Sequence, residues 1–336
     1  MQLPPILQRS LERMVAGQPA TALEQTAIAL STRYRELSTG QAPPITTPLE
    51  AVAYAAWRMP ATYAAVRAVF RRLAEAQPTF APTKMLDVGA GSGAAIWAAA
   101  EQWPSLQRVI AIERQLAMAR IGEQLMAGAG LPTVTWQRSD VLTIERLPES
   151  DLVVASYVYG EIEPSMRLTL LSRLWKATKG ALIFIEPGTP TGHTTILSIR
   201  DELIKRDIPI VAPCPHTAAC PLAEQHDWCH FAQRIARPAF QRRLKGATAP
   251  FEDEKFSYLI AARQGTPSTR GRIVRHPLIH SGHIELQVCT VQGVQHITVT
   301  RRHGAVWRQA RASEWGDGWD VDHAFTLATS SDKTNG

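Results

Sequence analysis

The chain has 336 residues, 45% of them hydrophobic, and its 36 lysines and arginines against 30 acids give a net charge of +6. This length and composition suit a globular protein of two domains, or of one large domain with an appendage. No apolar run approaches the roughly 18 residues that a membrane-spanning helix needs, so we expect no membrane association. The first residues, Met-Gln-Leu-Pro-Pro-Ile-Leu, lack the basic start and the apolar stretch of a signal peptide, and therefore predict a cytoplasmic protein.

The first part of the chain predicts helices. Apolar residues such as Leu7 and Leu11 recur at helical spacing in residues 1–45, which we expect to form an N-terminal helical region. A second helical stretch covers residues 48–77, and we expect Pro60 to interrupt it. The resulting helix corner is either a simple kink or a lid over the pocket that follows.

A glycine-rich turn follows an apolar strand in residues 84–93. Gly89, Gly91 and Gly93 let the backbone turn tightly and approach a ligand, and the helix after them offers amide donors at its N-terminus. Asp87 precedes the glycines, and the turn is one residue shorter than the dinucleotide fingerprint. These features favour a site for S-adenosylmethionine over one for a pyrophosphate.

Acids stand at the ends of the next two predicted strands. Glu113 lies about 20 residues beyond the glycines, where a carboxylate binds ribose hydroxyls, and Asp140 is a candidate for the adenine amino group. Either acid would alternatively be an ordinary surface carboxylate. The expected strands after the glycine turn are residues 108–113, 134–140, 151–157, 181–186 and 256–262. Their alternation with helices predicts a parallel, doubly wound α/β sheet in a domain spanning residues 46–264.

Cysteine is used sparingly and in a cluster. The four cysteines of the chain are Cys214, Cys220, Cys229 and Cys289. The gaps of five and eight residues between the first three are too wide for zinc-finger pairs and do not match the bacterial ferredoxin run. In the expected reducing compartment such a cluster favours a metal over disulfides. Four thiolates suit an iron–sulfur cluster, and zinc stays open because His216 or His230 could replace one thiolate.

The cysteine-rich segment, residues 211–250, looks like an insertion between the last strands of the sheet. After it, period-two strands in residues 265–320 predict a β-rich module, which we expect to be a small barrel that returns Cys289 to the insertion. Residues 321–336 are polar and are expected to form a flexible tail.

Basic residues gather in this half of the chain. Three blocks, residues 234–245, 263–275 and 301–311, contain several lysines or arginines and no acid. Such blocks are typical of a surface that binds a phosphate backbone, although a merely solvated basic face is the alternative. The candidate nucleic-acid-binding residues are Arg234, Arg237, Arg242, Arg243 and Lys245.

Taken together, these motifs resemble one family, the methyltransferase-like proteins associated with the small ribosomal subunit in bacteria and mitochondria. The strings that support the resemblance are Arg58-Met-Pro-Ala-Thr-Tyr63, Leu86-Asp-Val-Gly-Ala-Gly-Ser-Gly93, Glu186-Pro-Gly-Thr-Pro190, Ala212-Pro-Cys-Pro-His216, Cys220-Pro221, Asp227-Trp-Cys-His-Phe231 and Phe251-Glu-Asp-Glu-Lys-Phe-Ser-Tyr258. The resemblance implies a class I S-adenosylmethionine-dependent methyltransferase fold and a 4Fe-4S cluster on the four cysteines. It also implies binding to small-subunit rRNA, and we expect the protein to act as a monomer.

Whether such a protein catalyses methyl transfer is left open by the residues. Ser156, Tyr157 and Glu161 follow the fourth strand and are weak catalytic candidates, which either orient an amine or hydroxyl or only close the pocket. Methyl transfer proceeds largely by alignment, so the lack of an obvious base does not exclude it. The hypotheses are therefore an rRNA methyltransferase, a non-catalytic assembly factor that binds rRNA, and a small-molecule methyltransferase with structural zinc.

Overall fold

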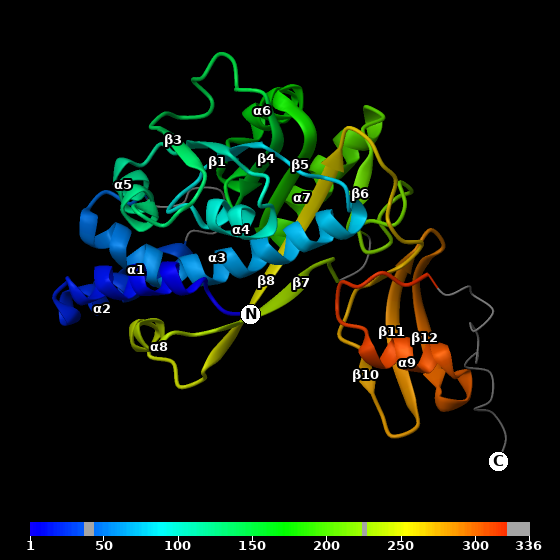
Figure 1. Cartoon of the computed structure of the whole chain (residues 1–336). Helices are drawn as coiled ribbons and strands as arrows, with labels where there is room; N and C mark the ends of the chain where they lie inside the picture. The colour runs from blue at the N-terminus through cyan, green and yellow to red at the C-terminus, as the bar shows by residue number, and fades with distance from the viewer. Residues whose placement is uncertain (37–43, 224–226, 321–336) are drawn as a thin grey trace.

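The computed structural model describes residues 1–36, 44–223 and 227–320 (Figure 1). The expected flexible tail therefore lies outside the described residues. No helix in the described ranges combines the length and the apolar character that crossing a membrane would require.

A large mixed β-sheet lies at the centre of the molecule (Figure 1). Its strand order is β3-β2-β1-β4-β5-β8-β6, and β7 pairs with the first half of β8. The strands are β1 (Lys84–Val88), β2 (Arg108–Ile112), β3 (Thr133–Gln137), β4 (Ser150–Ser156), β5 (Thr178–Pro187), β6 (Ile210–Ala212), β7 (Phe231–Ala236) and β8 (Phe251–Ala262). This order, with one antiparallel strand near the end of a parallel series, is that of the Rossmann-like methyltransferase fold. The predicted α/β class is confirmed.

The prediction of a wholly parallel sheet is wrong at β8. Strands β1 to β5 are parallel where they pair, but β8 runs antiparallel to β5, β6 and β7. A parallel neighbour needs a long crossover connection, usually a helix that packs on the sheet. Only the short helix α8 (Ala239–Lys245) separates β7 from β8, so the chain turns back and the two strands pair as an antiparallel ribbon.

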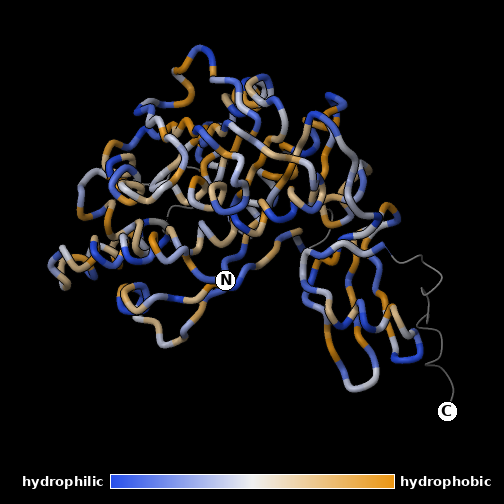
Figure 2. Tube along the Cα trace, in the orientation of Figure 1, coloured by the Kyte–Doolittle hydropathy of each residue, from blue (hydrophilic) through white to orange (hydrophobic). Residues whose placement is uncertain are grey.

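Helices cover both faces of this sheet. The helices of one face, which share a core cluster with the strands, are α1 (Pro5–Ala16), α2 (Ala20–Glu36), α3 (Pro48–Ala76), α4 (Ala94–Gln102) and α5 (Leu116–Met126). Helices α6 (Pro164–Ala177) and α7 (Pro190–Lys205) cover the other face. Alternate strand residues separate the two cores, since Met85 packs on the first side and Leu86 and Val88 pack on the second. Figure 2 shows hydrophobic residues along the central strands and hydrophilic residues on the outer turns.

Helix α3 is continuous through Pro60, so the predicted break there is wrong. A capping box starts the helix, because Thr47 accepts a hydrogen bond from the Glu50 amide while the Glu50 carboxylate accepts one from the Thr47 amide. Pro60 removes one hydrogen bond inside the helix. Its neighbours Met59 and Ala61 are buried in the protein interior, and this packing holds the helix together across the proline.

The chain beyond the large sheet forms a smaller antiparallel sheet with its own core. Its elements are β9 (Arg272–Ile273), β10 (Leu278–Ile279), β11 (His283–Thr290), β12 (Gly293–Thr300), a 3-10 turn η2 (Arg301–His303) and helix α9 (Ala305–Ala312). Strand β11 pairs with all three other strands. Strands β10 and β12 do not pair with each other among the described residues, so the predicted barrel is not confirmed. Helix α9, which the sequence analysis did not predict, packs on β11 and β12 and completes this core.

Candidate functional site

The first candidate site is a cavity at the edge of the large sheet where β1, β2 and β4 end. The predicted residues that line it are Gly89, Glu113, Asp140, Ser156, Tyr157 and Glu161. Helix α3 contributes Tyr54, Met59 and Thr62 to the same wall. The stretch around Pro60 therefore covers the pocket, although it is not a helix corner. Open α/β sheets bind their ligands in this position.

The glycine turn has the backbone conformation that its sequence requires. Gly89, Gly91 and Gly93 all have a positive φ, of 68°, 55° and 85° respectively. A Cβ at Gly89 would lie 2.5 Å from the Val158 side chain. A side chain on this residue would therefore displace Val158, which also lines the cavity, so glycine keeps this wall in place.

Glu113 holds the glycine turn in place. Its Oε2 accepts a hydrogen bond from the Gly91 amide at 2.8 Å, and its Oε1 accepts one from the Gln115 amide at 2.7 Å. Burial raises the pKa of this carboxyl despite these hydrogen bonds. Asp140 lies beyond the end of β3, because that strand ends at Gln137 and not at Asp140 as expected. Both acids line the cavity, as a ligand role requires.

Asp87 lies within the sheet and does not itself line the cavity. It is completely buried, and neither carboxylate oxygen has a hydrogen-bond partner among the described residues. Burial, reinforced by the charge of Glu113, raises its pKa to about 7. A buried carboxylate without a partner is costly, so this position is a source of strain directly beneath the glycine turn.

Tyr157 forms part of a buried network that closes the cavity. It follows β4 with a φ of 56°, an unfavourable conformation for a bulky residue, and its hydroxyl donates to Glu254 Oε1 at 2.9 Å. Arg58 donates to both oxygens of Glu254, at 2.9 and 2.6 Å, and lies 5.2 Å from the centre of the Tyr157 ring. Burial raises the pKa of Tyr157 well above its usual value. The Tyr157 hydroxyl therefore serves to hold the pocket wall through its hydrogen bond to Glu254. Both residues lie in strings that support the family resemblance, but nothing in the sequence pairs Arg58 with Glu254.

Glu161 is the catalytic candidate with the most suitable environment. It lines the cavity in a short 3-10 turn, η1 (Tyr159–Glu161), and its Oε2 lies 3.7 Å from Arg114 Nη2. Burial raises its pKa to about 7, against the opposing effect of Arg114. Ser156, the last residue of β4, lines the same wall. Glu161 is thus able to exchange a proton near neutral pH.

The second candidate site brings together all four cysteines. Cys214, Cys220 and Cys229 lie in the segment between β6 and β7, and Cys289 lies on β11 of the smaller sheet. All four are free thiols and line one cavity. This convergence agrees with the expectation from the sequence. The cavity is lined by Tyr258 of β8 and by Arg272 and Cys289 of the smaller sheet, so it lies between the two sheets.

Two buried arginines border the thiols. The Arg200 Nε donates to Cys214 Sγ at 3.2 Å, and the Arg272 Nε donates to the Pro213 carbonyl at 2.9 Å. Burial raises the pKa of Cys289 to about 12, and the neighbouring thiols contribute to this rise. Burial likewise raises the pKa of Cys229 well above its usual value. Four thiols this close cannot all ionise unless another cation compensates their charge.

The histidines considered as zinc ligands lie in different places. His216 lines the cavity, and its Nε2 lies 3.6 Å from Cys289 Sγ. The ring of His230 stacks on Trp228 instead, with a ring-centre distance of 5.2 Å. Among the described Cys, His, Asp and Glu side chains, no three ligand atoms that include a cysteine sulfur lie within 4.8 Å of one another. The four sulfurs thus line one cavity but are too far apart to share a single metal ion.

The predicted nucleic-acid-binding block is largely neutralised by acids that the sequence places elsewhere. Arg234 pairs with Asp253 at 2.8 Å, and both Arg237 and Lys245 pair with Glu252 at 3.2 and 2.5 Å. The other two residues of the block differ in their environment: Arg243 Nε lies 3.3 Å from a Glu24 oxygen, whereas Arg242 is exposed. The block lacks acids in sequence, but β8 supplies them across the β7–β8 ribbon.

The third basic block differs in this respect. Its arginines, which lie on η2 and α9, are Arg301, Arg302, Arg308 and Arg311. All four are exposed, and none forms an ion pair with the part of the chain that the structure describes. These residues form a cluster of uncompensated positive charge on one side of the smaller sheet, which we call the α9 arginine cluster.

The strand order, the glycine turn and the cavity at the strand ends define a protein of the Rossmann-like methyltransferase fold. The chain belongs to the family described as "Mitochondrial small ribosomal subunit Rsm22", whose profile matches residues 48–320. A human protein named "Ribosome assembly protein METTL17, mitochondrial" is 31% identical over an alignment of 304 positions, which covers 83% of this chain and 65% of that protein. The fission yeast "Rsm22-cox11 tandem protein 2, mitochondrial" is 24% identical over an alignment of 363 positions, which covers 92% of this chain and 48% of that protein.

Among solved structures, a magnesium protoporphyrin IX methyltransferase from Synechocystis PCC 6803 with bound S-adenosylmethionine is 14% identical, with a TM-score of 0.40. That match covers 70% of this chain and 91% of the other. The N-methyltransferase NodS from Bradyrhizobium japonicum WM9 is also 14% identical, with a TM-score of 0.38 and coverage of 60% of this chain and 96% of the other.

The predicted cytoplasmic location is wrong. The family and the relatives above are described as mitochondrial, which overturns the expectation of a cytoplasmic protein. That expectation rested on the first residues alone, and such a short segment is weak evidence for a compartment. The chain spans between about half and two thirds of the length of these relatives.

We expect Asp87→Asn to reduce the loss of stability that accompanies rising pH. Because the pKa of Asp87 is raised from 3.8 to about 7 by folding, the folded protein holds its proton more tightly than the unfolded one. The free energy of unfolding should therefore fall between about pH 4 and pH 7, by about 2 to 4 kcal/mol from this group. The Asp87→Asn variant lacks this contribution to the pH dependence, while the other buried acids retain theirs. The measurement is the free energy of unfolding in urea at several pH values.

The matched control for this experiment is Asp207→Asn. Asp207 is an exposed carboxylate with a φ of 55°, a conformation that asparagine also tolerates. The control should keep the pH dependence of the unmodified protein. Identical slopes for Asp87→Asn and Asp207→Asn would show that the buried carboxylate does not titrate as the structure implies.

Proposed function

We propose that this chain is an assembly factor of the small ribosomal subunit that binds S-adenosylmethionine and a 4Fe-4S cluster and contacts rRNA. The observation that supports this most directly is the family match over residues 48–320, which includes both candidate sites and the α9 arginine cluster. The human relative is named a ribosome assembly protein, and the resemblance seen in the sequence points the same way.

The charge of the first cavity supports S-adenosylmethionine as its ligand. This cofactor has a sulfonium and an ammonium group, so it favours a site with surplus negative charge. Glu113 and Asp140 line the cavity, and its single lining arginine, Arg114, lies 3.7 Å from Glu161. The glycine turn allows the backbone to approach the ligand closely. In this proposal Glu113 binds the ribose and Asp140 the adenine, since both line the cavity at the strand ends.

The separation of the sulfurs supports a cluster over a single zinc ion. Tetrahedral zinc with bonds of about 2.3 Å would bring its sulfurs to within about 3.8 Å of one another. No three donor atoms that include a cysteine sulfur lie within 4.8 Å among the described residues, although all four sulfurs line one cavity. A 4Fe-4S cluster binds each thiolate to a different iron and so suits this spacing. When bound, it supplies a redox-active inorganic centre. Cys214, Cys220, Cys229 and Cys289 would hold it.

Cys289→Ser should abolish stable cluster binding, because Cys289 supplies the only thiolate from the smaller sheet. In anaerobically purified protein we expect about four iron atoms per chain and a broad visible absorption. The variant should lose most of both. Gln287→Ser, two residues away on the same face of β11, is the matched control and should retain them. A colourless wild-type protein that carries a zinc ion lost in Cys289→Ser but kept in Gln287→Ser would refute the cluster.

The α9 arginine cluster is the surface best suited to RNA. Its four exposed arginines are free to replace counterions on phosphates, whereas most charges of the 234–245 block are already paired. We expect the variant with Arg301, Arg302, Arg308 and Arg311 changed to alanine to bind a small-subunit rRNA fragment more weakly. Its plot of log affinity against log salt should be less steep by about 2 to 3 units.

The matched control for RNA binding is the double variant Arg234→Ala with Arg237→Ala. It removes two arginines that are paired with Asp253 and Glu252, so the salt dependence should hardly change. The opposite result would be a less steep salt dependence of RNA affinity for the control and an unchanged one for the α9 variant. The RNA would then bind on the β7–α8 side, as predicted from the sequence.

A second candidate function is methyl transfer to rRNA, and Glu161 is the observation that favours it. A cavity-lining carboxyl with a pKa of about 7 is suited to accept a proton from an attacking amine. We expect Glu161→Gln to lose incorporation of labelled methyl groups into immature small subunits while still binding S-adenosylmethionine. Binding by the unmodified chain without any incorporation would leave the assembly role alone.

A further inference from the structure

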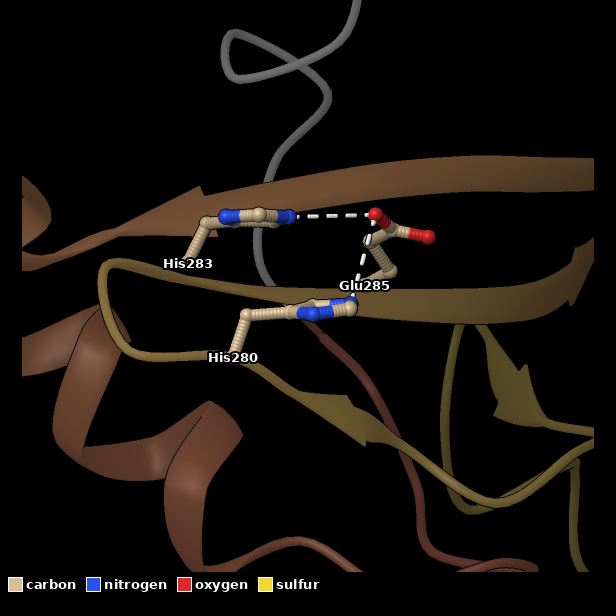
Figure 3. A group of neighbouring side chains, drawn as sticks. All are labelled: His280, His283 and Glu285. Atoms are coloured by element: carbon tan, nitrogen blue, oxygen red, sulfur yellow. Dashed lines mark hydrogen bonds and ion pairs between the residues drawn. The ribbon is translucent and has the colours of Figure 1, made fainter.

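A group of three metal-binding side chains lies on the smaller sheet, away from both sites described above. His280 and His283 flank the turn that joins β10 to β11, and Glu285 follows on β11 (Figure 3). The His283 Nε2 lies 3.1 Å from Glu285 Oε1, and the His280 Nε2 lies 3.6 Å from the same oxygen. The ligand atoms of all three lie within 4.8 Å of one another.

The distances fit one small divalent cation. Zinc binds imidazole nitrogen and carboxylate oxygen at about 2.0 to 2.2 Å in a tetrahedron, so two of its ligands are about 3.4 Å apart. The two measured separations, 3.1 and 3.6 Å, lie on either side of this value. Two imidazoles and one carboxylate are also a ligand set that zinc accepts with a water in the fourth position.

The backbone of the hairpin sets this arrangement. The His280 amide donates to the His283 carbonyl at 2.9 Å, which places the two histidines directly opposite each other. Glu285 lies two residues beyond His283 and so points to the same face. Ile284, between them, points into the core of the smaller sheet. The rings of His280 and His283 stack with centres 4.3 Å apart, and both direct Nε2 toward Glu285 (Figure 3). The ligands are therefore arranged before any metal binds.

We propose that His280, His283 and Glu285 form a zinc site that fastens strand β10 to the smaller sheet. Strand β10 has only two residues, and its side chains Leu278 and Ile279 are 53% and 60% exposed. It buries little apolar surface that would hold it against β11. A metal that joins His280, at the end of β10, to two residues of β11 supplies the missing attachment.

The attachment has a consequence for a neighbouring groove. Ile279 lines a cavity together with Arg72 of α3 and Trp315, so β10 forms one wall of a groove between the large sheet and the smaller one. The zinc site fixes the position of this wall. It is independent of the cysteine site, and its existence does not rest on the proposed function.

Cobalt titration of the full chain tests the site, with the cysteine cluster already loaded. Cobalt replaces zinc and gives visible bands, and with nitrogen and oxygen ligands it lacks the strong near-ultraviolet absorption of thiolate ligation. We expect one cobalt per chain to bind with such a spectrum, and zinc to displace it. His283→Ala and Glu285→Gln should each weaken binding at least about tenfold. Hydrogen exchange of the His280 amide should slow when zinc is added.

His296→Ala is the matched control, because His296 is an exposed histidine on the adjacent strand β12, opposite Gln287. It should bind cobalt as the unmodified chain does. All three substituted residues are at least partly exposed, so the variants should fold, and circular dichroism verifies this. The proposal is overturned if His283→Ala and Glu285→Gln bind cobalt as tightly as the control does. It is also overturned if only thiolate-type absorption appears, or if zinc does not change the hydrogen-exchange rate of the His280 amide.

Discussion

Strand β8 holds the two candidate sites in one body, because it is the strand to which β5, β6 and β7 all pair. Its Glu254 binds Arg58 of α3 and the hydroxyl of Tyr157 at the wall of the first cavity. Three residues further on, the Ser257 hydroxyl donates to the Cys229 carbonyl at 2.8 Å in the cysteine site. A shift of β8 along its axis would disturb both sites together. Such a shift would break the ion pair between Arg58 and Glu254, whose side chains are only 25% and 12% exposed, and would leave two poorly solvated charges.

The parts of this arrangement that sequence could predict are those set by local chemistry. The glycine turn needs positive φ at successive glycines, and the acids at the ends of β2 and β3 follow from the alternation of strands and helices. Glu113 and Asp140 were accordingly placed at the correct edge of the sheet, and both line the cavity. The convergence of the cysteines was also predictable, because a cluster of rare residues with one distant member implies that the chain returns to it.

The contacts that could not be predicted from the sequence are those between segments far apart in the chain. Arg58 and Glu254 are 196 residues apart and meet only because α3 packs against β7 and β8. The ion pairs of the predicted RNA-binding block have the same cause: the pairing of Arg234 with Asp253 follows from strand register, which an acid-free run of sequence does not reveal. Pro60 is a comparable case, because propensity predicts a break and burial on the sheet overrides it.

The two proposed metal sites both take ligands from strand β11, but their ligand types favour different metals. Residues at every second position of β11 face the same way, so His283, Glu285 and Cys289 share a face. Six residues of extended chain separate His283 from Cys289, a distance of about 20 Å, which is too great for one centre to draw ligands from both. Thiolates favour iron–sulfur chemistry, whereas imidazole and carboxylate favour a lone divalent ion. With both proposed metals bound, β11 would join the smaller sheet to the large one through sulfur at one end and hold its own edge hairpin through nitrogen and oxygen at the other.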